Sequence, residues 1–223
     1  MKGSLFGQAI AKFTLGVVLV GALIFLPAGT LAFWNGWLLM GILFVPMFCA
    51  GLVMLAQNPA LLESRLRAKE GRGSQQKVIR YSGLMFLAGF VTAGLDFRFG
   101  WSRLPKGVPL GAAVAFLLAY LLYAEVLREN AYLSRTIEVQ EGQQVIDTGL
   151  YGIVRHPMYS ATLLLFLSMP LVLGSLYAFL LFLAYPMLIV RRIRDEEVFL
   201  RQELPGYEAY QQKVRWRLLP FFW

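Results

Sequence analysis

The stretch YSATLLLFLSMPLVLGSLYAFLLFLAYPMLIV, residues 159–190, is a long apolar run with Gly174 and Ser175 near its middle. A helix that crosses a bilayer needs about 20 apolar residues, so this run is too long for one crossing and short for two. Glycine weakens a helix, and Pro170 and Pro186 are candidate kinks within the run. The run therefore predicts a tight helical hairpin that turns at Gly174 and returns the chain to the face from which it came.

The composition of the whole chain is that of a membrane protein. Hydrophobic residues make up 58% and charged residues 15% of the sequence, against roughly 45–50% and about 25% in soluble proteins. Four more apolar runs precede the hairpin, at about Ile10–Trp34, Gly36–Gln57, Tyr81–Asp96 (extending towards Trp101) and Pro109–Leu127. We therefore expect an all-α integral membrane protein with about five to six transmembrane helices, including the hairpin, and a cytoplasmic C-terminal helix.

We expect a single membrane domain, residues 1–223. Residues 1–128 would form four N-terminal spans, and residues 129–223 would form a motif loop, the hairpin and the tail. The first apolar run is longer than the core of a typical signal peptide and is followed almost at once by another, so we expect a retained helix. The sequence leaves the oligomeric state open.

The distribution of charge predicts the orientation of these helices. Six crossings would place the N-terminus and residues 58–80, 128–158 and 191–223 on one side of the membrane. That side holds all but three of the 21 Lys and Arg residues, the exceptions being Arg98, Arg103 and Lys106. The positive-inside rule makes it the cytoplasmic side of a bacterial-type inner membrane, with both termini in the cytoplasm. The net charge of +8 would then attract anionic headgroups of membrane lipids.

Several classes of function are disfavoured by the residues present. The basic residues are spread over separate loops without a binding module, so we expect no nucleic-acid partner. His156 is the only histidine and Cys49 the only cysteine, so we expect no bound metal. Transporters hold ionisable residues at mid-membrane, and the corresponding positions here are nearly all apolar or small.

The segment GLYGIVRHPMY, residues 149–159, directly precedes the hairpin and is the first candidate site. Pro157 suits the first position of a helix, whose unpaired N–H groups and positive dipole end would point to the cytoplasmic interface. With Arg155 and His156 alongside, this helix start could bind a carboxylate or a phosphate. The alternative is structural: Arg155 contacts headgroups, His156 caps a helix, and Tyr159 belongs to an interfacial belt.

Charged residues cluster where the last span leaves the membrane and form the second candidate. At helical spacing Arg191 would pair with Asp195, Arg192 with Glu196 and Arg194 with Glu197, which is ordinary surface stabilisation. The functional alternative is that Glu196 and Glu197 bind ligand hydroxyl or ammonium groups while an arginine holds an acidic acceptor.

Two further clusters allow a structural and a functional interpretation. Glu125 and Glu129, with Arg128 and Asn130, form either an interfacial ion-pair cluster or a polar wall for a substrate. In the tail, the side chains of Tyr207, Tyr210 and Arg217 either pack against the bundle or close a lid.

Taken together, these residues resemble the integral-membrane methyltransferases of the isoprenylcysteine carboxyl methyltransferase and phospholipid methyltransferase type. The matching features are the Gly-Tyr turn before Arg155-His156-Pro157-Met158-Tyr159, the two-helix hairpin after it, and Glu196-Glu197. The resemblance continues through Tyr207, Tyr210 and residues 214–220, and covers about the last third of the chain. Ala161 departs from the pattern, because many relatives carry a glycine there.

The resemblance implies S-adenosylmethionine (SAM) bound on the cytoplasmic side and a lipophilic acceptor that enters from the bilayer. It implies a cofactor pocket made by Gly149, Leu150, Tyr151, Arg155, His156, Pro157, Tyr159, Glu196 and Glu197. Arg191 or Arg194 would orient a carboxylate acceptor, and Glu196 could take the proton of an amine acceptor. Glu125, Glu129 and Asn130 would contact the substrate. The identity of the acceptor is not inherited, because the acceptor-specific residues of the eukaryotic enzymes lie outside the matched motifs.

Two other functions remain as alternatives. Sterol and steroid reductases share a related motif and bind a nicotinamide cofactor, but they typically have Asn after the Pro and an acidic residue just past the Tyr. Here those positions are Met158 and, beyond Tyr159, Ser160-Ala161-Thr162. The third possibility is a non-catalytic membrane protein that keeps the fold as a scaffold or lipid-binding module.

Overall fold

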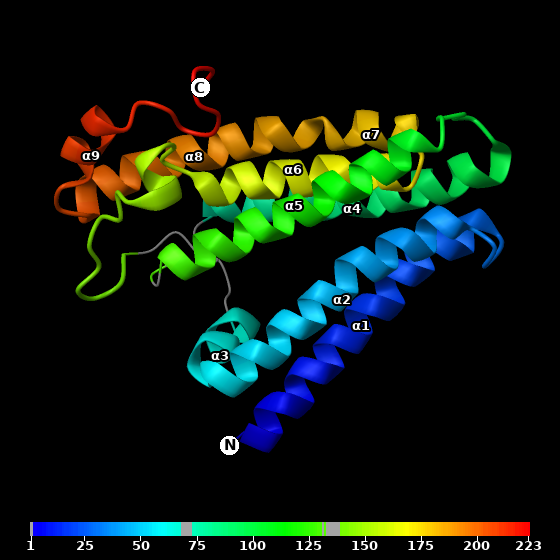
Figure 1. Cartoon of the computed structure of the whole chain (residues 1–223), viewed down its shortest axis with the longest axis horizontal. Helices are drawn as coiled ribbons and strands as arrows, with labels where there is room; N and C mark the ends of the chain where they lie inside the picture. Colours follow the sequence, from blue (N-terminus) through cyan, green and yellow to red (C-terminus); the bar gives the residue numbers. More distant parts are fainter. Residues whose placement is uncertain (1, 68–72, 131, 133–138) are drawn as a thin grey trace.

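A computed structural model of the chain describes residues 2–67, 73–130, 132 and 139–223. Within these residues every regular element is helical (Figure 1). The elements are α1 (Lys2–Ala28), α2 (Trp34–Gln57), α3 (Pro59–Arg67), α4 (Gly73–Phe99), α5 (Gly107–Glu129), the 3₁₀ turn η1 (Gly149–Gly152), α6 (Pro157–Val172), α7 (Leu176–Phe182), α8 (Ala184–Glu203) and α9 (Tyr207–Lys213).

In the part of the chain that the structure describes, five helical segments are long and apolar enough to cross a membrane: Leu5–Ala28, Trp34–Gln57, Gln76–Phe99, Gly107–Glu129 and Leu176–Glu203. α6 is a shorter apolar helix of 16 residues, about 24 Å long against a hydrocarbon core of about 30 Å. The expected all-α integral membrane fold with five to six segments is therefore confirmed. The short α3 was not predicted.

The first two spans meet at Gly29, five residues earlier than the expected end of the first run. Gly29 has φ +69° and donates its N–H to the carbonyl oxygens of Phe25 and Leu26, a glycine-terminated helix end. Trp34 consequently begins α2 and does not end α1. Further along, Gly94 allows α4 to approach α1 closely, since a Cβ there would lie 2.5 Å from the carbonyl oxygen of Ile24.

The predicted hairpin turns at Gly174, which has φ +78° between α6 and α7. Ser175 caps α7 by accepting the N–H of Ala178 at 3.0 Å and also donates to the buried carboxylate of Asp96 in α4. Asp96 further accepts the backbone N–H of Ser102 at 2.6 Å. The buried carboxylate of Asp96 therefore links the turn to α4. The hydropathy pattern had placed Asp96 at the end of an apolar run.

The returning arm of the hairpin is divided into α7 and α8 around Leu183. Pro186 has no N–H and cannot donate to the carbonyl of Phe182, so the helical hydrogen-bond ladder is interrupted there. α8 then continues beyond the apolar run as far as Glu203, which carries the Arg191–Glu197 segment out of the bundle on the same helix.

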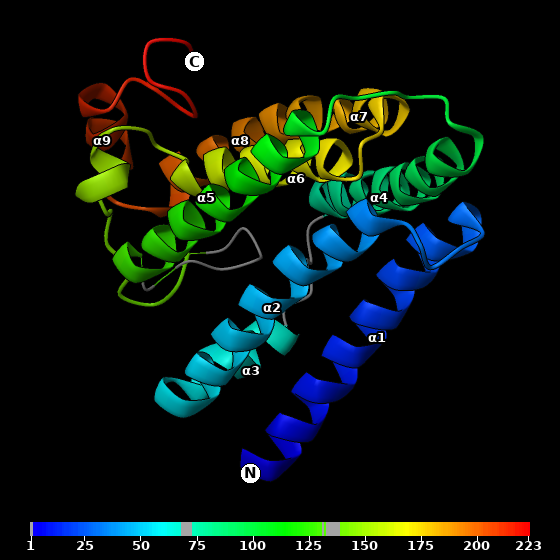
Figure 2. The same ribbon diagram turned by 45° about the vertical axis from the view of Figure 1, so that its right-hand side comes forward.

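The ends of the helices separate into two groups (Figures 1 and 2). The N-terminus, α3, η1 and α9 lie at one end of the bundle, whereas the α1–α2 and α4–α5 connections lie at the other. This arrangement places the candidate motifs of the C-terminal third at the end that the charge pattern predicts to be cytoplasmic.

Candidate functional site

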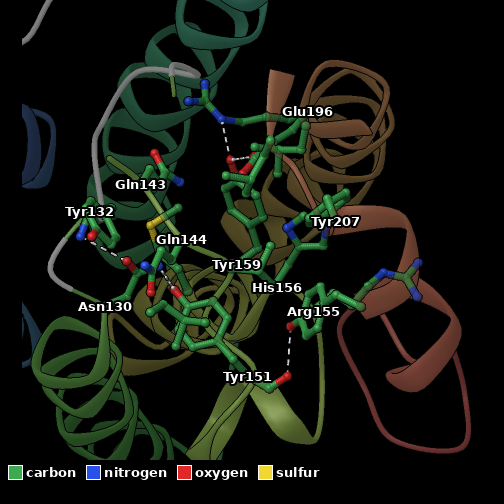
Figure 3. Close-up of a pocket in the computed structure, with 17 residues that line it drawn as sticks. Asn130, Tyr132, Gln143, Gln144, Tyr151, Arg155, His156, Tyr159, Glu196 and Tyr207 are labelled. Carbon is green, nitrogen blue, oxygen red and sulfur yellow. Dashed lines mark hydrogen bonds between the residues drawn. The ribbon is translucent and has the colours of Figure 1, made fainter. Parts of the chain in front are cut away.

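A pocket opens at this end of the bundle, between the C-terminal end of α5, the connection after residue 138, the N-terminal end of α6, α8 and α9 (Figure 3). Its lining is polar and rich in tyrosine. The lining residues are Asn130, Tyr132, Gln143, Gln144, Val145, Ile146, Tyr151, Arg155, His156, Met158, Tyr159, Arg192, Glu196, Leu200, Leu204, Tyr207 and Tyr210.

The segment before α6 is held by the C-terminal tail, which runs beside it. The backbone N–H groups of Arg155 and His156 donate to the carbonyls of Trp216 and Arg217 at 2.8 and 2.9 Å. Ser160 Oγ, in the first turn of α6, donates to the carbonyl of Leu218 at 2.6 Å. The tail therefore fixes the position of the motif residues and is not a detached lid.

Glu197 is a buried ion-pair centre behind the pocket wall. Its Oε1 accepts Nε of Arg155 at 2.8 Å and lies 3.3 Å from Nε2 of His156, and its Oε2 accepts Nε of Arg217 at 2.9 Å. The side chain is 2% exposed and is not among the lining residues. In the structure Glu197 therefore contacts Arg155 and His156 from behind the pocket wall, and its expected contact with the cofactor stays a prediction.

The guanidinium of Arg155 is fully engaged with the protein. Besides Glu197, it donates through Nη1 to the carbonyls of Val214 and Arg215 at 2.7 and 2.9 Å. Glu197 thus pairs with both Arg155 and Arg217, and these contacts hold the Arg155 side chain in place.

Glu196 faces the pocket from the next position of α8. Its Oε2 accepts the hydroxyl of Tyr159 at 2.5 Å, and that hydroxyl accepts Nε of Arg192 at 2.8 Å. Arg192 and Glu196 are four residues apart and lie on the same helix face. The result is a connected Arg–Tyr–Glu group on one side of the pocket (Figure 3).

The two arginines that were expected to orient the acceptor do not reach this pocket. Arg191 and Arg194 are exposed, whereas Arg192 is buried and lines the pocket. A helix advances by about 100° per residue, so neighbours of an inward-facing residue point elsewhere. The spacing predicted Arg192 at the surface, whereas in the structure it is 9% exposed and lines the pocket.

Of the three residues expected to contact the substrate, only Asn130 lines the pocket, where its side-chain amide donates to the Tyr151 hydroxyl at 3.0 Å. Glu125 forms an ion pair with Arg128 at 2.5 Å on the helix surface. Glu129 accepts the backbone N–H of Leu150 at 2.9 Å and so holds η1 in place. The polar-wall interpretation therefore applies to Asn130 alone.

The turn at residues 149–151 supports the pocket mainly through its backbone. Gly149 has φ +49°, and a Cβ there would lie 1.3 Å from Oε1 of Glu129, so the position accepts only glycine. Tyr151 is the one residue of this turn that lines the pocket, while Gly149 and Leu150 lie outside the lining, as does Pro157 at the start of α6. Burial raises the pKa of Tyr151 to about 12, which keeps its hydroxyl protonated.

The sequence did not predict that residues 143–146 contribute to the pocket, whose lining includes Gln143, Gln144, Val145 and Ile146. Val145 packs against the buried cluster of Leu204, Tyr207, Tyr210 and Val214. This short segment has no helical or strand periodicity that would have indicated its place in the pocket. Tyr207 and Tyr210, by contrast, were singled out from the sequence, and both are buried and line the pocket.

The motif residues before α6, the charged residues of α8 and the tyrosines of α9 thus meet in one polar pocket. Residues 111–202 match the model of the isoprenylcysteine carboxyl methyltransferase (ICMT) family. The matched region includes the Arg155-His156-Pro157 motif, the hairpin and Glu196-Glu197. The predicted resemblance to this family is therefore confirmed over these residues.

The chain is also similar to the Delta(14)-sterol reductase of Mus musculus. The two are 32% identical over 133 residues, which cover 52% of this chain and 32% of the reductase. The chain thus spans about a third of the length of this relative.

Proposed function

We propose that this protein transfers the methyl group of SAM to a lipophilic acceptor that enters from the bilayer. One observation carries the proposal: the matched motif and Glu196 meet in the same pocket, at the end of the bundle that the charge pattern assigns to the cytoplasm. A water-soluble donor would approach from that side and a lipid from the membrane side.

The chemistry of the pocket residues fits SAM. The carboxylate of Glu196 faces the cavity and could hold the ammonium of the donor. Asn130, Gln143 and Gln144 supply amides, and the tyrosine rings supply flat apolar surface that suits adenine. Tyr207 adds a buried hydroxyl without a hydrogen-bond partner among the described residues.

SAM, when bound, supplies an activated methyl group on a positively charged sulfur. The protein then mainly has to align the acceptor and exclude water, so no nucleophilic triad is needed. Arg192, held by Tyr159, is the arginine placed to orient an acidic acceptor. For an amine acceptor, Glu196 is the carboxylate placed to take the proton.

The similarity to a sterol reductase makes nicotinamide-dependent reduction the second candidate. NADPH carries a pyrophosphate and a further phosphate, which require several cations that can reach the ligand. Two arginines are among the described lining residues, and one of them, Arg155, is engaged with Glu197 and two backbone carbonyls. This arrangement favours a donor with little negative charge, such as SAM.

Ligand binding to the purified protein in lipid nanodiscs separates these candidates. We expect calorimetry to show binding of SAM and its demethylated product, and none of NADPH at equal concentrations. Labelled methyl groups from SAM should then appear in the lipid fraction of a total membrane extract, where mass spectrometry identifies the acceptor. Binding of NADPH without SAM would replace the proposal with the reductase.

A further inference from the structure

The hydroxyl of Tyr207 is a buried polar atom without a hydrogen-bond partner in the part of the chain that the structure describes. The residue is 4% exposed and lines the pocket. Native structures pair nearly all buried polar side-chain atoms, because an unpaired one costs free energy relative to its hydrated state. An unpaired hydroxyl in a pocket wall therefore indicates a group that a ligand completes.

The neighbouring tyrosine on the same helix provides a direct contrast. Tyr210 is equally buried and lines the same pocket, but its hydroxyl donates to the carbonyl of Tyr151 at 2.7 Å. The short helix α9 thus presents two buried tyrosine hydroxyls. That of Tyr210 is hydrogen-bonded within the protein, and that of Tyr207 has no partner among the described residues. If Tyr207 served packing alone, phenylalanine would do so without a buried polar atom.

We propose that Tyr207 is a ligand-binding residue whose hydroxyl donates a hydrogen bond to the carboxylate of the methionine part of SAM. This inference rests on the proposed function and adds to it the position of one end of the donor. It assigns to Tyr207 a specific role in recognition.

The surroundings of Tyr207 support a carboxylate as its partner. Tyr207 lies beside His156 in Figure 3, on the side of the pocket that Arg155 lines. Glu197, on this side, is neutralised by Arg155 and Arg217, and the N-terminus of α6 directs its positive dipole end to the same region. A ligand carboxylate would therefore lie beside two arginines and a helix N-terminus, although it would not contact the engaged guanidinium of Arg155 directly.

The other pocket carboxylate accounts for the second charge of the amino-acid group. In SAM the carboxylate and the ammonium are attached to the same carbon, so a binding wall must offer a donor and an anion close together. Tyr207 offers the donor, and Glu196 offers the anion from α8. Burial, together with the nearby Glu197 and Glu196, raises the pKa of Tyr207 well above its usual range, so its hydroxyl remains a donor at any working pH.

The test compares wild type, Tyr207→Phe and Tyr210→Phe in nanodiscs, by calorimetry with two ligands and by thermal unfolding without ligand. One ligand is SAM, and the other is decarboxylated SAM, which keeps the sulfonium and the amine. For Tyr207→Phe we expect about tenfold weaker binding of SAM and unchanged binding of decarboxylated SAM. Its unfolding temperature without ligand should be unchanged or raised, because the variant removes an unpaired buried hydroxyl.

Tyr210→Phe is the matched control. It should lower the unfolding temperature, because it leaves the carbonyl of Tyr151 without its donor. A lowered unfolding temperature in Tyr210→Phe but not in Tyr207→Phe distinguishes a ligand-binding hydroxyl from a structural one.

The outcomes separate this inference from the proposed function. If wild type binds SAM and Tyr207→Phe binds it equally well, the assignment of Tyr207 is overturned and the methyltransferase proposal stands. An equal loss of affinity for both ligands overturns the assignment to the carboxylate. If wild type binds neither ligand, the proposed function fails and this inference fails with it.

Discussion

Glu197 and Arg155 form a buried ion pair, with Nη2 and Oε1 2.7 Å apart and both side chains about 5% exposed or less. The pair joins the end of the motif loop to α8 across the hairpin. Because Glu197 also accepts Nε of Arg217, one carboxylate holds together the motif, the last long helix and the tail. The integrity of the pocket therefore depends on a residue that is not in the pocket wall.

Replacing Glu197 with Gln should destabilise the protein by roughly 3–5 kcal/mol, because two guanidinium groups then face a neutral amide in a buried site. Binding of SAM should weaken at least tenfold as Arg155 and His156 lose their support. Unfolding in detergent and calorimetry in nanodiscs measure the two effects. Glu203→Gln, an exposed position on the same helix, is the control and should change neither quantity.

Removal of the hydrogen-bonding guanidinium in Arg192→Met should lower the rate of methyl transfer at least tenfold, because Tyr159 and Glu196 lose the group that orders them. The exposed neighbours provide the controls: Arg191→Met and Arg194→Met should keep most of the activity. Initial rates with labelled SAM and lipid extract give the measurement. Equal losses in all three variants would contradict the assignment of Arg192.

A methyl group at Gly149 should be tolerated poorly. Gly149→Ala would place Cβ 1.3 Å from Glu129 Oε1 at a backbone φ of +49°, so we expect a loss of about 2 kcal/mol or more and displacement of η1. Gly111→Ala in α5 has open space around it and should be neutral or slightly stabilising. Thermal unfolding of both variants provides the comparison, and similar values for the two would count against this geometry.

The ion pair of Asp147 with Lys213 should make a pH-dependent contribution to stability. A hydrogen bond from Lys213, with its charge, lowers the pKa of the Asp147 carboxyl below its usual value. A lowered folded-state pKa means that the contribution is present above the unfolded pKa of about 3.9 and fades as the pH falls through the folded pKa. Wild type should therefore exceed Asp147→Asn in unfolding temperature at pH 7 by a small margin that shrinks as the pH falls below the unfolded pKa of about 3.9. A margin that stays constant on acidification would contradict the ion pair.

Much of the fold was predictable because hydropathy and chain breaks act locally. The long apolar runs, the turn at Gly174 and the motif before Pro157 could be identified from residue type and spacing alone. The end of α1 at Gly29 was missed, because the apolar character of the chain continues through the turn to Trp34. α3 was missed because its residues carry no long apolar run.

The spacing of the charged residues did not predict which of them line the pocket and which lie behind its wall or at the surface. Glu196 and Glu197 are adjacent in sequence, yet Glu196 faces the pocket and Glu197 lies behind its wall. Arg192 and its two exposed arginine neighbours are chemically identical and differ only in helix phase. That phase depends on how α8 packs against the rest of the bundle, which involves residues far away in sequence.

The sequence by itself determined that the chain is a helical membrane protein, that its C-terminal third returns to the face it left, and that this third resembles a membrane methyltransferase. The first two conclusions follow from transfer free energies and local backbone preferences, which each segment carries on its own, and the third rests on the motif residues that carry the resemblance. The tertiary structure decided that Arg192 lines the pocket, that Glu197 supports it, and that the hydroxyl of Tyr207 has no hydrogen-bond partner among the described residues. These properties arise from the relative rotation and contact of α6, α8 and the tail, and such contacts between distant segments leave no periodic trace in the sequence.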